Sequence, residues 1–277
     1  LSPGPLSLLQ DAGRPGLAAI GVSTSGTFDQ GARVRANLAV GNPGHAAVVE
    51  ALIGPLVLRA LAPTVVAADG ASAPLDVLRQ DADGAAPVHS TDGAHAGPVA
   101  LDPGDRISLG PAAGGLRLVL AVRGGLRSEG GAVLGAMSRD TLSGLGPGPL
   151  AAGDVLRAGD EHGLDAVPFS EPAEPEAPEA AEPEAPGAAD APAPLLEVPV
   201  HPGPRHTLLG PSALAHLLST VWTVRQDSDR VGVRLEGPAL PVPPGVGTLP
   251  SEPMVPGAIQ VPPSGLPVVF GPDHPTT

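Results

Sequence analysis

The chain has 277 residues, of which 42% are hydrophobic and 1% aromatic, and its formal net charge is −14. A core of valine, leucine, isoleucine and alanine is therefore expected, and the negative charge argues against nucleic acid as a partner. There is no cysteine and all 15 basic residues are arginine, which excludes disulfides, thiol nucleophiles, thiolate metal sites and a biotinyl-lysine on this chain.

The predicted elements of the first half are short. Asp29 can cap a helix that stops at Gly41, although the apolar residues of this segment alternate and would also fit a strand. Strands are predicted at residues 65–68 and at residues 117–122, which read RLVLAV. No apolar run could span a bilayer and no signal-peptide pattern opens the sequence, so the chain is expected to be cytoplasmic and without a membrane partner.

An acidic, proline-rich stretch separates two regions of folded character. It covers residues 169–195 and is predicted to be a disordered linker or insertion, because proline recurs too often for helix or sheet and little can be buried. Residues 1–168 and 196–277 are the predicted folded regions. In the second region Ser212 can cap a helix running to Val221, and the alternation at residues 231–235 predicts a half-buried strand.

The turn-forming composition favours a mainly β fold. With 38 glycines and 37 prolines, the short strands are punctuated by many turns, as in barrels and sandwiches. Common catalytic signatures are missing: no phosphate-binding G-x-x-x-x-G-K-[ST] loop, no G-x-S-x-G, no S-x-x-K and no H-E-x-x-H. The histidines form no pair at metal-ligand spacing with a third ligand nearby, so no metal site is predicted.

What remains is an ordered series of polar clusters in glycine- and proline-rich turns. Any one of them could be a turn alone, since aspartate and serine beside glycine or proline commonly cap turns. The blocks are QDAGRPG (10–16), SGTFD (25–29), ANLAVGN (36–42), LGAMSRDTLSGLG (134–146), SDRVGVRLEGP (228–238), VPGAIQVPPSGLP (255–267) and DHPTT (273–277). In this order they resemble the biotin-dependent carboxyltransferase (subdomain A/B) family. That family includes the C subunit of 5-oxoprolinase, proteins formerly named allophanate hydrolase subunit 2, and the carboxyltransferase region of urea carboxylase.

The resemblance implies cyclophilin-like β-barrel subdomains with a few short helices. It also implies one component of an enzyme, inactive alone, that works with A-like and B-like 5-oxoprolinase subunits as its partners. The implied reaction opens the lactam of 5-oxo-L-proline to L-glutamate and uses ATP, bound by the partner or at a shared interface. Two departures stand out: Pro253 replaces the glycine common in the family, and the sequence ends at Thr277 where relatives continue, so a truncated last barrel is expected.

Lactam opening needs donors for a developing oxyanion and a carboxylate for water or the amide. Asp273 is predicted as general base or amide acceptor, with Thr276 and Thr277 as hydroxyl donors. Asn37 and Gln260 are predicted to donate to a substrate carbonyl. Alternatively, Asn37 caps the end of its helix and Asp273 only forms a turn.

Binding of a substrate carboxylate or phosphate needs cations and hydroxyls. Arg14 or Arg230 is predicted for this role, because the guanidinium fork binds such groups through two parallel hydrogen bonds. Ser25, Asp29 and Glu252 complete the predicted binding residues. Arg230 could instead pair with a neighbouring carboxylate, that of Asp227 or Asp229.

Two other functions compete with lactam opening. One is the carboxyltransferase component of a biotin-dependent urea or amide carboxylase, for which another chain would have to carry the biotin. The other is a non-catalytic regulatory binding module, as some relatives are named as regulators of a sporulation kinase and its inhibitor. Gene neighbours would separate the three.

Overall fold

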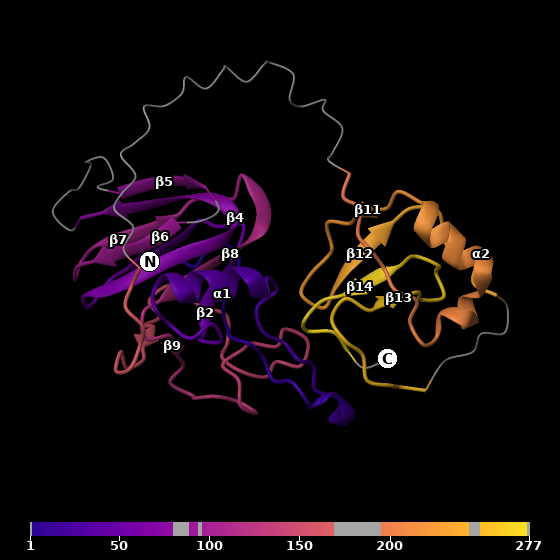
Figure 1. Cartoon of the computed structure of the whole chain (residues 1–277), viewed down its shortest axis with the longest axis horizontal. Coiled ribbons are helices and arrows are strands. Elements are labelled where there is room, and N and C mark those ends of the chain that lie inside the picture. Colours follow the sequence, from indigo (N-terminus) through magenta and orange to yellow (C-terminus); the bar gives the residue numbers. More distant parts are fainter. Residues whose placement is uncertain (1, 80–88, 94–95, 169–194, 244–249, 276–277) are drawn as a thin grey trace, which may run out of the picture.

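The computed structural model describes residues 2–79, 89–93, 96–168, 195–243 and 250–275, which form two lobes side by side (Figure 1). The first lobe is built on an eight-stranded sheet. Its strands are β1 (Ser7–Gln10), β2 (Val48–Leu52), β3 (Leu56–Arg59), β4 (Thr64–Leu78), β5 (His89–Gly93), β6 (Ala96–Leu101), β7 (Arg106–Leu109) and β8 (Gly114–Val122).

The long strand β4 explains why this sheet curls into a half-barrel. Its first part pairs with β6 and β8, and its last part, from Ala73 onward, pairs with β5 and β7. Register shifts interrupt the pairing after Val66 and after Gly70, and such irregularities bend a strand and increase its twist. The main path of the antiparallel sheet is β1-β2-β8-β4-β7-β3, so β3 lies at the end opposite to β1.

Alternation along the strands places the core inside the curl. On β4 the side chains of Ala71, Ala73, Leu75 and Val77 are buried at every second position, as the period of a strand requires. The outer face is covered by helix α1 (Gln30–Ala39), whose Ala32 and other small residues pack against β2, β4 and β8. The small side chains allow close packing, which fits the low aromatic content.

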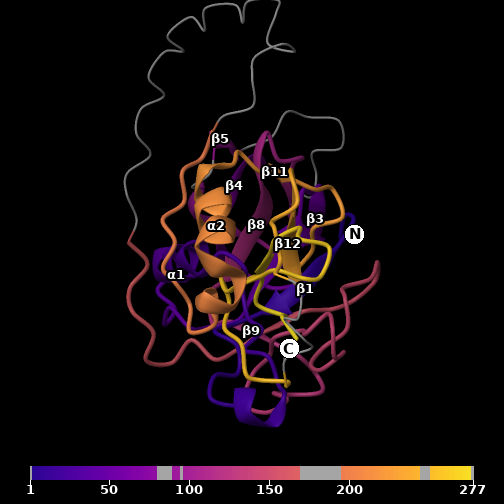
Figure 2. The same cartoon turned by 90° about the vertical axis from the view of Figure 1, so that its right-hand side faces the viewer.

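The second lobe holds a four-stranded sheet of order β11-β12-β14-β13. The strands are β11 (Thr223–Val224), β12 (Gly232–Glu236), β13 (Ile259–Gln260) and β14 (Val268–Phe270). Helix α2 (His206–Ser219) lies beside this sheet, on the side away from the first lobe, as the two views show together (Figures 1 and 2). A strand pair, β9 (Leu126–Arg127) with β10 (Arg157–Ala158), and a 3-10 turn, η1 (Ala18–Ile20), complete the described elements.

Most sequence predictions of elements are confirmed. The fold is mainly β, helix α1 has Asp29 as its N-cap, and the strands predicted at 65–68, 117–122 and 231–235 correspond to parts of β4, β8 and β12. The Asp29 carboxylate accepts from the Ala32 N–H at 2.8 Å, so the capping signals and not the alternation decide the helix. The acidic segment and its boundaries stay predictions, because residues 169–194 lie outside the described residues.

The predicted start of the second helix is wrong. Ser212 lies inside α2, which begins at His206 and is kinked at Gly210, where φ is +75°. The kink lets Pro211 start a new helical turn, where its missing N–H costs nothing. The apolar residues Leu218 and Val221 of the predicted helix are exposed, and the helix ends at Ser219. None of the described helices is both long and apolar enough to cross a membrane.

Candidate functional site

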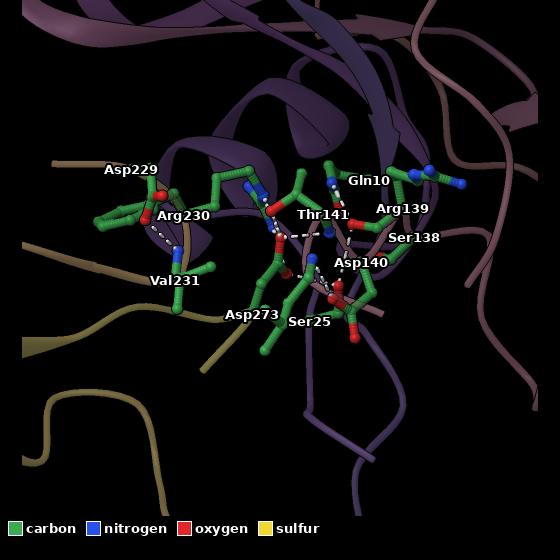
Figure 3. Close-up of polar contacts among 12 residues, drawn as sticks. Gln10, Ser25, Ser138, Arg139, Asp140, Thr141, Asp229, Arg230, Val231 and Asp273 are labelled. Atoms are coloured by element: carbon green, nitrogen blue, oxygen red, sulfur yellow. Dashed lines mark hydrogen bonds and ion pairs between the residues drawn. The ribbon is translucent and has the colours of Figure 1, made fainter. Parts of the chain in front are cut away.

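Loops and strands from both lobes meet in a polar cluster between them (Figure 3). We use the name interlobe cluster for its five residues, Ser25, Glu50, Thr141, Arg230 and Asp273. Glu50 lies on β2, Ser25 and Thr141 lie in loops of the first lobe, and Arg230 and Asp273 flank the strands β12 and β14 of the second. All except Thr141 are at most 1% exposed.

Asp273 is the centre of this cluster. Its Oδ1 accepts hydrogen bonds from Ser25 Oγ at 2.7 Å and Arg230 Nη2 at 3.1 Å. Its Oδ2 accepts from the N–H and hydroxyl of Thr141, at 2.9 and 2.7 Å, and from Arg230 Nε at 2.8 Å. Both oxygens are therefore occupied by groups of the chain itself, which fixes the carboxylate in one orientation.

Arg230 joins the two carboxylates of the cluster. Besides Asp273 it contacts Glu50, with Nη1 at 2.5 Å from Oε1, and its Nη2 donates to the Gly26 carbonyl. Burial, the largest influence, lowers the pKa of Arg230, but Glu50 and Asp273 together outweigh it and raise that pKa above its ordinary value. The cation is thus held charged between two buried anions.

A second arginine, on the neighbouring strand, also forms an ion pair with Glu50. Arg117 on β8 lies 3.5 Å from the Glu50 carboxylate, and its guanidinium sits over the Phe28 ring, 5.4 Å from the centroid. The pKa of Arg117 is lowered, mainly by burial. The Glu50 carboxylate raises this pKa and the neighbouring Arg230 cation lowers it further, but burial has the largest effect. The Phe28 N–H also donates to Glu50, at 2.6 Å, so the carboxylate orders the start of α1.

Ser25 reaches Asp273 from a strained backbone position. Its φ is +55°, in the left-handed region that residues other than glycine rarely adopt, and such strain costs about 1–3 kcal/mol and gathers at functional sites. The Ser25 N–H donates to Pro272, at 2.8 Å. Its hydroxyl lies within hydrogen-bond distance of both Asp273 and the Arg139 carbonyl, and with one proton it donates to one at a time.

A second buried carboxylate, Asp140, organises the loop that carries Thr141. Its oxygens accept from the Ser23 hydroxyl at 2.9 Å, the Ser143 hydroxyl at 2.6 Å and the N–H groups of Leu142 and Ser143. Burial is the largest influence and raises its pKa, but these hydrogen bonds together lower the pKa of Asp140 below its ordinary value. The loop is therefore held by an ionised aspartate.

The loop after β1 is tied to the same segment. Asp11 accepts from the Ser138 hydroxyl at 2.5 Å and from the N–H groups of Gly13 and Met137. Gln10 donates to the Arg139 carbonyl at 2.8 Å. Blocks that are far apart in the sequence are thus hydrogen-bonded neighbours around residues 138–141 (Figure 3).

Two buried polar atoms beside this segment have no hydrogen-bond partner among the described residues. One is Nη1 of Arg14, whose Nη2 donates to the Ser138 carbonyl at 2.5 Å; the side chain is 2% exposed. The other is Oε1 of Gln10. No carboxylate of the described residues lies within ion-pair distance of Arg14. An unpaired buried donor, cation or acceptor is costly, so these atoms are candidates for ligand contacts.

The structure brings three of the predicted site residues into direct contact, namely Ser25, Arg230 and Asp273. Arg14 lies beside them through the segment that begins at Ser138. The alternative that Arg230 pairs with Asp227 or Asp229 is wrong. Asp227 pairs with Arg225, and the Asp229 carboxylate accepts from the N–H groups of residues 231 and 232.

The other predicted residues lie elsewhere or outside the described part. Asn37 is buried near the end of α1, where its side chain donates to the Ala46 carbonyl and accepts from Asn42; the C-cap of the helix is Val40, so neither the donor role nor the capping alternative is shown. Asp29 is the exposed N-cap of the same helix, and Glu252 pairs with Arg205 on the surface. Gln260 lies half-buried on β13. Thr276 and Thr277 lie outside the described residues, so their roles and the catalytic roles of the others stay predictions.

Sequence reasoning missed Glu50, Thr141 and Asp140. Glu50 left a signal, because a charged residue in the middle of the apolar strand VVEAL has to be paired to be buried. Thr141 and Asp140 lie in a block that the sequence marked without choosing a residue in it. Among the described residues, no group of histidine, aspartate and glutamate could hold a metal ion.

Known proteins are similar to almost the whole length of this chain. Residues 20–277 match the family model described as carboxyltransferase domain, subdomain A and B. The chain belongs to this family. This confirms the resemblance drawn from the sequence blocks, four of which supply Ser25, Thr141, Arg230 and Asp273 to the interlobe cluster.

Individual members of the carboxyltransferase A/B family differ in how much of their length the chain covers. It is 28% identical over 276 residues to the C subunit of 5-oxoprolinase from Escherichia coli K12, covering 99% of this chain and 79% of that protein. It is 30% identical over 245 residues to urea amidolyase of Lachancea kluyveri, covering 86% of this chain and 12% of that protein. The crystal structure of Kluyveromyces lactis urea carboxylase superimposes with a TM-score of 0.73 at 25% identity, covering 100% of this chain and 24% of that chain.

Proposed function

We propose that the chain is one component of an ATP-dependent 5-oxoprolinase that opens 5-oxo-L-proline to L-glutamate together with A-like and B-like partner subunits. The observation that carries this proposal is the extent of the match: 99% of this chain corresponds to 79% of a protein named as the C subunit of 5-oxoprolinase. The urea amidolyase match, in contrast, involves 12% of a far longer protein.

The site chemistry is compatible with this substrate. 5-Oxoproline offers a carboxylate, a lactam N–H and a lactam carbonyl. Nη1 of Arg14 is a buried donor without a partner, suited to the carboxylate, and Oε1 of Gln10 is a buried acceptor without a partner, suited to the N–H. Thr276 and Thr277 stay the proposed donors to the reacting carbonyl, and Asp273 stays the proposed base or amide acceptor.

The occupied oxygens of Asp273 favour a positioning role over proton abstraction in the state described. A general base needs a lone pair within reach of the proton it takes, and each oxygen here already accepts from Arg230 and from a hydroxyl. If Ser25 or Thr141 moved on substrate binding, a lone pair on one Asp273 oxygen would become free to accept a proton. The proposal therefore assigns Asp273 first to holding Ser25, Thr141 and Arg230 in place.

ATP would supply the phosphoryl group that makes the lactam carbonyl a good electrophile. The interlobe cluster itself does not fit a triphosphate, because Arg230 is committed to Asp273, Glu50 and a carbonyl, and the chain has no lysine. The nucleotide contacts are therefore proposed for a partner protein or a shared interface.

The test is ATP-dependent release of glutamate from 5-oxoproline by this chain together with its cognate A-like and B-like partners, each omitted in turn. Glutamate formed only by the complete set is the expected result. In that assay Arg14→Gln should raise KM for 5-oxoproline at least ten-fold with a smaller change in kcat. Arg157→Gln, an exposed arginine far along the chain, is the matched control and should leave both unchanged.

The runner-up is carboxyl transfer within a biotin-dependent urea carboxylase, favoured by the likeness to urea amidolyase and urea carboxylase. The chain has no lysine for biotin, so a carrier protein would be required. An assembled, folded complex that releases no glutamate but transfers a carboxyl group from a carboxybiotin carrier to urea would replace the oxoprolinase proposal. Absence of both activities would leave the regulatory binding module.

A further inference from the structure

Two arginines face each other across neighbouring strands at the far end of the large sheet. Arg59 ends β3 and Arg106 begins β7, and the antiparallel register pairs them directly. In the sheet order β3 and β7 lie at the end opposite to β1 and β2, and β2 carries Glu50 of the interlobe cluster. Neither arginine has a hydrogen bond or ion pair to a residue of the interlobe cluster, so the pair is distinct from the site described above.

Like charges placed directly opposite each other destabilise a sheet, and solvent weakens that repulsion here because both arginines are exposed. A counter-ion normally removes this cost. Within the described residues, no carboxylate lies within ion-pair distance of Arg59 or Arg106, and neither side chain makes a hydrogen bond. This is unexpected in a chain with 29 acidic residues against 15 basic ones.

The carboxylates of the adjoining turn are engaged elsewhere. Asp105 and Asp102 both pair with Arg79, which follows β4, and Asp105 also accepts from the Asp102 N–H at 2.8 Å. Asp105 is buried, so it is not free to turn towards the arginine pair. Backbone hydrogen bonds also hold the turn in place, since the Gly104 N–H donates to the Ala60 carbonyl and the Ala60 N–H donates to the Asp105 carbonyl.

The two arginines line a hollow of about 310 Å³ together with Ala60, Leu61, Pro103 and Gly104. That volume lies at the lower end of the range of small-molecule sites. Among the described residues that line it, the guanidiniums of Arg59 and Arg106 are the charged groups. Guanidinium groups bind phosphate oxygens through paired hydrogen bonds, and two of them on facing strands could hold one phosphate group between them.

We propose that this hollow binds the phosphate group of a small phosphorylated molecule, with Arg59 and Arg106 as its two cationic contacts. The proposal does not depend on 5-oxoproline being the substrate, since it concerns another part of the sheet. Pairing with a dianion would remove the remaining cross-strand repulsion and so stabilise the folded chain.

The test uses the full 277-residue chain and inorganic pyrophosphate as the probe, at fixed ionic strength, followed by calorimetry and ³¹P NMR. We expect saturable one-to-one binding that raises the unfolding temperature. Arg59→Gln and Arg106→Gln should each weaken binding at least ten-fold. Without pyrophosphate, each variant should unfold at the same temperature as the wild type or higher, because one of two repelling charges has been removed. A merely structural arginine would show the opposite shift.

The control is Arg157→Gln, which removes an exposed arginine from β10 and should bind pyrophosphate as the wild type does. The proposal fails if binding is not saturable, if it is unchanged in both Arg59→Gln and Arg106→Gln, or if Arg157→Gln weakens it equally. Acetate or glutamate binding as tightly as pyrophosphate would also overturn it, since the site would then select carboxylates. Arg106→Lys, which keeps the charge and loses the fork, should bind more weakly than the wild type.

Discussion

Asp273 carries the densest set of polar contacts in the interlobe cluster, and its charge matters as much as its hydrogen bonds. It is fully buried and shares Arg230 with Glu50, so the site contains a cation between two anions. Removing one partner of such a group leaves another charge buried without full compensation. The residue is therefore expected to be essential to stability, whatever its part in the reaction.

Replacing Asp273 by asparagine keeps its size and removes its charge. Asp273→Asn should lower the free energy of unfolding by about 3–5 kcal/mol, because Arg230 would keep only Glu50 as a buried counter-ion. Urea unfolding followed by circular dichroism measures this. Asp227→Asn, which breaks the exposed pair with Arg225, is the matched control and should have little effect. Equal stability of Asp273→Asn and the wild type would show that the ion pair is not formed in solution.

Asp140 gives a prediction for pH dependence. Its folded-state pKa lies below the ordinary value of 3.8, so its stabilising contribution is complete above that value and is lost as the pH falls through the lower folded-state pKa. Asp140→Asn should therefore be less stable at neutral pH and should lose less stability than the wild type on acidification below about pH 4. Unfolding temperatures across this range measure the difference in slope, and parallel slopes would contradict the prediction.

The loop between β1 and α1 places Ser25 and depends on two glycines. Gly13 and Gly26 have φ of +81° and +88°, and their backbones touch, so a Cβ on Gly26 would lie 3.0 Å from the Gly13 nitrogen. A Cβ on Gly13 would overlap the Thr24 carbonyl oxygen. This close approach is what brings Ser25 from one side and Asp11 from the other to the segment around Ser138.

Gly13→Ala should destabilise the chain by about 2–5 kcal/mol, from backbone strain and steric overlap together. Gly16→Ala is the matched control in the same loop: its φ is +85°, but nothing lies within 4 Å of the added methyl group, so only the strain of about 1–2 kcal/mol is expected. Thermal unfolding of both variants compares them. A loss from Gly16→Ala as large as that from Gly13→Ala would show that packing at residue 13 is unimportant.

At the level of elements, the sequence predicts what local signals determine. Asp29 and Gly41 bound α1 by capping, and the apolar run 117–122 forms β8 because a buried strand needs little more than such a run. The start of α2 was misplaced because Ser212 has the chemistry of an N-cap, whereas the helix begins at His206 and is kinked at Gly210. The pairing of β4 with four other strands depends on contacts across the curl, which no short pattern contains.

In the candidate site, too, the sequence marks single residues but not the contacts between them. Ser25, Arg230 and Asp273 could be marked because each lies in a recognisable block, but their mutual contacts could not be derived. Glu50 was missed because its partner Arg230 lies 180 positions further along the chain. The role of Asp29 is decided by a neighbour three residues away, and there the capping interpretation agrees with the structure. The Asn37 side chain instead bonds to Ala46 and Asn42 beyond the helix, which no capping signal predicts.

For the whole molecule, the interlobe cluster predicts that the two lobes unfold together. Arg230 and Asp273 of the second lobe are bonded to Glu50, Ser25 and Thr141 of the first. The wild type should therefore show one calorimetric unfolding transition, and Arg230→Gln should broaden it or split it into two. The four-stranded lobe should unfold first because it has fewer buried apolar residues.

The control for this experiment is Arg234→Gln on β12, whose arginine is partly exposed and 3.9 Å from Asp227. It should keep the wild-type transition. A single transition in Arg230→Gln, with equal calorimetric and van't Hoff enthalpies, would show that the lobes are coupled by contacts other than the cluster.

The long separation between Glu50 and Arg230 also has a meaning for the growing chain on the ribosome. The 180 residues between them take about 10–40 s to synthesise at ordinary rates of translation. Until Arg230 is made, Arg117 is the one cation of the described residues that can pair with the Glu50 carboxylate, and until Asp273 is made the Ser25 hydroxyl lacks its aspartate partner. The first lobe therefore emerges with an incomplete charge balance, and only a polypeptide that has been translated through residue 273 can settle into its final state.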